Sequence, residues 1–81
     1  MHEYAITKEL FRVAREAAQK NNMKNIREIV VELGNLSGYV AESIQYYFEE
    51  LKQSRDTLHK AQLKFKEVNG TDINIKSIKG E

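Results

Sequence analysis

The sequence predicts an α+β fold in which two helices pack on one face of a three-stranded mixed sheet, in the order α-β-α-β-β. Two stretches, residues 4–21 and 40–53, repeat apolar side chains at three- and four-residue spacing, as the buried face of a helix does. Three others, residues 26–33, 62–68 and 71–78, alternate or mix apolar and polar side chains, as half-buried strands do. One sheet covered on one face by both helices would bury every apolar stripe.

Composition restricts the class of protein. The 81 residues suffice for one small domain, 1–81. The chain has no cysteine, so it has no disulfide and no thiolate metal site. A net charge of +1 gives no electrostatic reason for a nucleic-acid partner. The chain starts with polar residues and has no apolar run of membrane-spanning length, so we expect a cytoplasmic protein that is neither secreted nor membrane-bound.

The first helix is expected over residues 4–21. Small side chains near its end, Ala14, Ala17 and Ala18, would let another element approach closely. Asn21 and Asn22 are expected to stop it, because asparagine tolerates the left-handed conformation. Its apolar stripe is expected to comprise Ile6, Leu10, Val13, Ala14 and Ala17.

The second helix is expected over residues 40–53, after a strand that Gly34 ends and a loop at 34–38. Tyr39, Tyr46 and Tyr47 are expected to pack in the core and at its rim, since acidic side chains nearby do not suit nucleic-acid stacking. The segment 54–60 is polar and irregular. The apolar stripe of this helix is expected to comprise Val40, Ile44, Tyr47, Phe48 and Leu51.

The last two strands flank Asn69-Gly70. This dipeptide between alternating runs predicts a β-hairpin with a type I′ turn, whose two central residues need positive φ. The strand order stays open. If the first two strands pair directly, the helix between them is a right-handed crossover and that pair is parallel.

The first three residues, Met1-His2-Glu3, form the candidate metal site. Met1 is expected to be retained, because methionine aminopeptidase trims only before small residues. The α-amine, the His2 backbone amide and the His2 imidazole can then close fused chelate rings around one ion. Nitrogen-rich tetragonal coordination suits Ni(II) or Cu(II). The tripeptide alone favours an idle, frayed terminus.

Three motifs together resemble a known family. MHEY opens the chain, LGNLSG follows the first strand at 33–38, and IKSI lies at 75–78. These resemble HypA, the nickel metallochaperone of nickel–iron hydrogenase and urease maturation. The resemblance implies a non-enzymatic carrier of Ni(II) whose nickel site maps onto Met1, His2 and Glu3. It also implies a maturation GTPase of the HypB type as partner, with the hydrogenase large subunit or the urease system as recipient.

One departure from that family is large. HypA proteins carry a zinc domain with two Cys-x-x-Cys pairs, inserted between the second and third strands. Here Asn69-Gly70 stands at that place, so we expect the zinc domain to be absent between 68 and 71 and no structural zinc to bind. In such a fold we expect the two flanking strands to be adjacent and antiparallel, so that a two-residue type I′ turn is the shortest good way to rejoin them. Both an engineered excision and a natural short form fit the sequence.

The ligand set and the function leave alternatives open. Glu3 is expected to act either as a ligand or as a partner of the imidazole. Glu42 is a further candidate ligand by resemblance to a carboxylate at a helix start, and His59 is expected to lie exposed in a loop. The alternative function is a metal-independent protein–protein interaction module. A homodimer formed by strand exchange through the short 68–71 connection is also possible.

Overall fold

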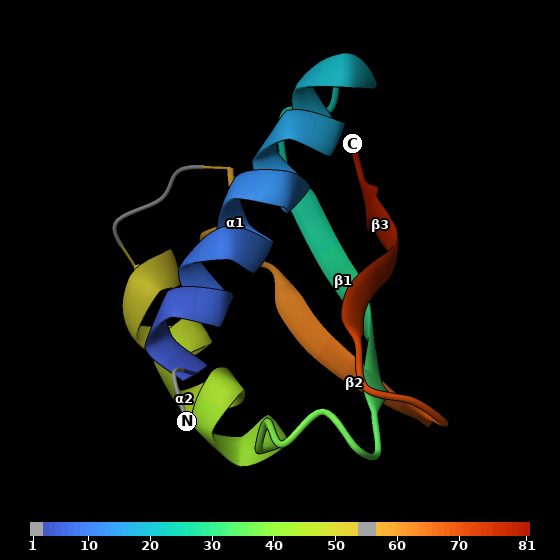
Figure 1. Ribbon diagram of the computed structural model, residues 1–81. Helices are drawn as coiled ribbons and strands as arrows, with labels where there is room; N and C mark the ends of the chain where they lie inside the picture. Colours follow the sequence, from blue (N-terminus) through green and yellow to red (C-terminus); the bar gives the residue numbers. More distant parts are fainter. Residues whose placement is uncertain (1–2, 54–56) are drawn as a thin grey trace.

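A computed structural model describes residues 3–53 and 57–81. Two helices, α1 (Glu3–Lys20) and α2 (Ala41–Lys52), cover one face of a sheet formed by β1 (Ile26–Gly34), β2 (Gln62–Val68) and β3 (Ile73–Gly80) (Figure 1). The predicted α+β class, element order and mixed sheet are confirmed. Each element begins and ends within two residues of its predicted bounds. In the described part of the chain, neither helix has the length and apolar character needed to cross a bilayer.

The order of the strands is β2-β1-β3, with β1 parallel to β2 and antiparallel to β3. The first two strands therefore pair directly and in parallel, which is one of the arrangements that the sequence left open, and the predicted hairpin between the last two is wrong. Ile29 and Val31 of β1 are 2% and 0% exposed, and a strand buried to this extent takes the centre of the sheet. Gly70 has a φ of 126° but Asn69 does not adopt positive φ, so a type I′ turn does not form.

The connection from β2 to β3 instead crosses the end of β1, as four residues, 69–72. The N–H of Asn35 donates to the carbonyl of Val68, and the N–H of Gly34 donates to that of Asp72, both at 2.8 Å. A Cβ on Gly34 would lie 2.4 Å from the carbonyl oxygen of Gly70, so only glycine allows this close crossing. We expected a two-residue turn between adjacent strands, and this expectation was also the reason for considering a strand-exchange dimer. The structure corrects it, because β2 and β3 are not adjacent and four residues connect them.

Helix α1 buries a stripe that differs in part from the predicted one. Val13 is 37% exposed, whereas Phe11 is 3% exposed and takes its place in the core. The helix ends as predicted at the two asparagines. Asn22 has a φ of 53°, and the N–H of Met23 donates to the carbonyl of Ala18 at 2.8 Å, which is a Schellman motif. The buried residues of α1 are Glu3, Thr7, Leu10, Phe11, Ala14 and Ala18.

The core between the helices and the sheet centres on Phe48 of α2. Its ring stacks on that of Phe11, with centroids 5.0 Å apart. The segment expected to be polar and irregular also contributes, because Leu58 is fully buried, as is Ala61 directly after that segment. Tyr46 is 61% exposed at the rim, and its ring meets that of Tyr47 edge to face.

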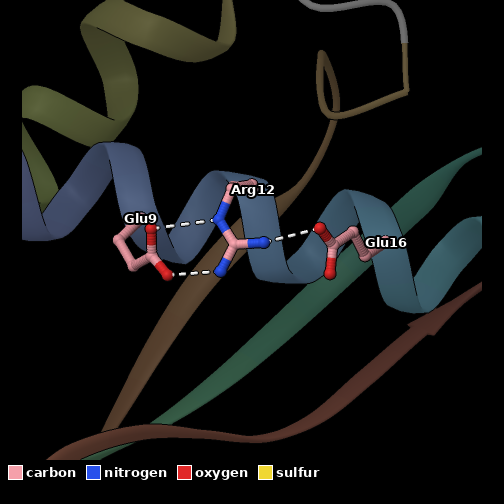
Figure 2. A network of polar contacts seen from close by, with 3 residues as sticks. All are labelled: Glu9, Arg12 and Glu16. Carbon is pink, nitrogen blue, oxygen red and sulfur yellow. Dashed lines mark hydrogen bonds and ion pairs between the residues drawn. The ribbon is translucent and has the colours of Figure 1, made fainter.

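The solvent face of α1 carries a short charge network. Arg12 donates to Glu9 on one side and to Glu16 on the other, both at 2.5 Å (Figure 2). The hydrogen bond from Arg12 lowers the pKa of the Glu9 carboxyl. All three side chains are about half exposed, and such pairs one helical turn apart contribute only about 0.2–0.5 kcal/mol each.

Candidate metal site

Glu3 is the member of the predicted Met1-His2-Glu3 site that the structure describes. Met1 and His2 lie outside the described residues, so their role stays a prediction. Glu3 is the first residue of α1 and is only 8% exposed, which is unusual for a carboxylate. Its burial needs a hydrogen-bond partner, and that partner belongs to the other helix.

The Glu3 carboxylate accepts a hydrogen bond at the start of α2. Its Oε2 accepts from the backbone N–H of Val40 at 3.1 Å. Val40 is the N-cap residue of α2, and its apolar side chain makes no capping hydrogen bond. Glu3 therefore supplies from α1 an acceptor for the N–H of Val40, one of the donors at a helix start that have no partner within the helix. The contact ties the starts of both helices together, and both helix dipoles favour a negative charge there.

Thr7 supports the same first turn of α1. Its hydroxyl donates to the carbonyl oxygen of Glu3 at 2.5 Å, and the residue is fully buried. Sequence reasoning missed both Thr7 and the Val40 contact. The available signal was spacing, because Glu3, Thr7 and Leu10 follow one another at four and three residues on the buried face.

The other candidate ligands lie on the surface. Glu42 is exposed in the first turn of α2, and His59 is exposed in the turn at 57–60, as predicted for it. Within residues 3–53 and 57–81, no three histidine, cysteine, aspartate or glutamate side chains are placed to hold a metal ion.

A pocket of about 400 Å³ opens beside the start of α2. Tyr39 and Ala41, which flank Val40, both line it. Polar and apolar groups share its walls about equally, and Glu67 is the carboxylate among them. One carboxylate gives too few oxygen ligands to hold a metal ion. The full set of lining residues is Leu33, Gly34, Asn35, Tyr39, Ala41, Phe65 and Glu67.

Comparison with protein families assigns the chain. Residues 1–78 match the model of the family described as hydrogenase/urease nickel incorporation, metallochaperone, HypA. The hydrogenase maturation factor HypA of Campylobacter jejuni is 33% identical over 63 residues, which are 78% of this chain and 55% of that protein. The HypA of Francisella philomiragia is 40% identical over 48 residues, which are 59% and 42% of the two chains. The chain thus spans about half the length of the curated relatives it matches.

Solved structures agree with this assignment at the level of the fold. The solution structure of the Ni metallochaperone HypA from Helicobacter pylori superposes with a TM-score of 0.90 at 18% identity, over 99% of this chain and 97% of that one. A second solution structure of a HypA protein gives a TM-score of 0.81 at 17% identity, over 100% and 97% of the two chains. The family whose model matches the chain is described as a metallochaperone family. The chain belongs to the HypA family, which serves nickel incorporation into hydrogenase and urease.

Proposed function

We propose that residues 1–81 form a single nickel-binding domain that carries Ni(II) for hydrogenase or urease maturation, with Met1, His2 and Glu3 as its metal site. The observation that carries the proposal is the family match, which starts at residue 1 and so includes all three residues. The proposed domain lacks a zinc module between 68 and 71 and binds no structural zinc, since it has no cysteine thiolate. Its proposed partners are a HypB-type GTPase and the hydrogenase or urease recipient.

The buried position of Glu3 supports the proposed site. The hydrogen bond from the Val40 N–H holds the Glu3 carboxylate in place. The chain therefore has a fixed position at Glu3, directly after His2. When Met1 carries the free amine, that amine, the His2 amide and the His2 imidazole can chelate one ion beside this point. A cation at a helix N-terminus is disfavoured by roughly 0.3–1 kcal/mol. The Glu3 charge at the starts of both helices offsets this.

A carrier must also release its metal. A site made of three adjacent terminal residues leaves coordination positions open for a recipient's ligands. The α-amine and imidazole have reference pKa values of about 8 and 6.5, so the amine takes up a proton as pH falls through about 8 and the imidazole as it falls through about 6.5. Nickel binding by this site should release protons and weaken with falling pH.

Calorimetric titration with nickel sulfate tests the proposal. We expect the chain with a free Met1 amine to bind about one ion, because all three chelating groups are then present. A matched chain with a Gly-Ser extension before Met1 should bind at least about tenfold more weakly, which is 1.4 kcal/mol. Equal and weak binding by both chains would contradict the terminal site. The domain would then be better described as a metal-independent interaction module.

Glu3 variants separate a positioning role from a ligand role. Glu3→Ala removes the acceptor for the Val40 N–H, so we expect a loss of about 1 kcal/mol in unfolding free energy, as for a lost N-cap. Nickel affinity should also fall about tenfold, as it does when the support of a metal ligand is removed. Glu3→Gln keeps an acceptor oxygen and should recover most of both losses. Urea unfolding and nickel titration measure the two effects.

The glutamine variant decides between the two roles. If Glu3→Gln regains stability but binds nickel as weakly as Glu3→Ala, the charged carboxylate itself contacts the metal or the imidazole. The matched surface control is Glu42→Gln, which changes the charge in the first turn of α2 at an exposed position. That control should leave unfolding free energy within about 0.5 kcal/mol of the starting chain.

A further inference from the structure

The sheet face turned away from the helices carries an excess of lysine. Val31 on β1 faces the core, so its neighbours Val30 and Glu32 face outward. The outer strands place lysines on both sides of this central row. The charged residues of this open face are Glu28 and Glu32 on β1, Lys64 and Lys66 on β2, and Lys76 and Lys79 on β3.

Charge is balanced at one end of this face only. Glu28 lies between Lys64, at 3.3 Å, and Lys79, at 3.7 Å. At the other end, Lys66 pairs with Glu32 in the strand register, and Lys76 of β3 comes close to Lys66 across the central strand. Within the described ranges, neither of these two lysines forms an ion pair with a carboxylate.

A β-bulge brings Lys76 to this position. Val30 pairs with Ser77 and Val31 pairs with Ile75, so Lys76 is the extra residue on β3. The bulge keeps Lys76 beside Ser77 on the open side and returns Ile78 to the side that packs on the core. Bulges of this kind commonly re-aim a side chain, and here the redirected side chain is a cation next to another cation.

The neighbouring Lys66 disfavours the charged form of Lys76. Lys66 holds the pKa of Lys76 below its ordinary value, first by hydrogen bonding to it and then by charge repulsion, while Glu32 acts in the opposite direction. Lys76 keeps its charge more readily when an anion lies against it. The solvent face of α1 differs, because Arg12 there already lies between two carboxylates (Figure 2).

We propose that the open face of the sheet docks an acidic protein segment, whose carboxylates bind the Lys66 and Lys76 ammonium groups. Val30, half-buried between Lys64 and Ser77, gives this surface an apolar centre with a charged rim, as protein interfaces have. Exposed lysines on edge strands also discourage aggregation. That role needs a lysine on an edge, but not two lysines that converge over the central strand.

The probe is a blocked peptide of alternating glutamate and alanine, titrated into isotope-labelled protein and followed by amide chemical shifts. We expect shifts centred on residues 30–32, 64–66 and 75–77, because these surround the lysine pair. About 0.5 M NaCl should remove most of the effect by screening the exposed charges. Lys66→Glu combined with Lys76→Glu should weaken binding at least about tenfold.

A matched double variant controls for net charge. Lys8→Glu with Lys20→Glu makes the same charge change on α1, which covers the opposite face, and should alter binding less than about twofold. Should the charge reversal unfold the domain, Lys66→Gln with Lys76→Gln tests the same point. Shifts spread evenly over α1 and the sheet, or tighter binding of a single-stranded oligonucleotide, would overturn the proposal. The nickel titration is independent of this result.

Discussion

Replacing His2 by alanine should abolish tight nickel binding, with at least about a hundredfold loss of affinity, or 2.7 kcal/mol. The imidazole is the side-chain ligand of the proposed chelate, and without it the amine and one amide remain. Residue 2 precedes α1, so the fold should not change. Calorimetric nickel titration at pH 7.5 measures the loss, and repetition at pH 6 should show weaker binding by the unchanged chain, because protons compete for both nitrogens.

The other histidine provides the control for this prediction. His59 is exposed in the turn at 57–60, so His59→Ala removes an imidazole without disturbing the core or the proposed site. Its nickel affinity should equal that of the unchanged chain. An unaltered affinity in His2→Ala would refute the proposed site, and a loss of affinity in His59→Ala would move the search for ligands to that turn.

The helices and strands could be predicted because their apolar periodicity is local. The order of the strands could not, because it depends on pairing across the chain. Asn69-Gly70 is a strong hairpin signal, but the burial of Ile29 and Val31 gives β1 a partner on each side. The long-range pairing therefore overrides the local turn preference, and the link spreads over four residues to cross the end of β1 at Gly34.

The candidate site was predictable in its chemistry but not in its surroundings. A histidine at position two suggests a chelate from sequence alone. The burial of Glu3 has only the weaker signal of its helical spacing to Thr7 and Leu10, and a glutamate in the first turn of a helix normally lies exposed near the helix dipole. Its partner is the backbone N–H of Val40, 37 residues along the chain. Every residue except proline has such a group, so residue types do not indicate which one takes this role. Leu58 was missed for a related reason, because it is an isolated apolar residue in a polar turn.

Phe48→Ala should remove most of the domain's stability, because this ring fills the centre of the core. Phe48 is 1% exposed and stacks on Phe11 with the two ring planes 25° apart. Truncating a buried phenylalanine to alanine costs about 3–5 kcal/mol, through lost burial and the cavity left behind. A domain of 81 residues has a total stability of roughly 4–12 kcal/mol. We therefore expect a fall in melting temperature of roughly 15–30 °C.

Circular dichroism during urea and thermal unfolding measures this effect, and Tyr46→Ala is the matched control. Tyr46 lies two residues earlier on α2 and is 61% exposed, so its truncation should change the unfolding free energy by no more than about 0.5 kcal/mol. A loss below about 1 kcal/mol in Phe48→Ala would contradict the assignment of this ring to the centre of the core.

The starts of α1 and α2 meet at Glu3 only if both helices are held on the sheet. For that reason Phe48→Ala should also weaken nickel binding under conditions where the unfolded state is populated.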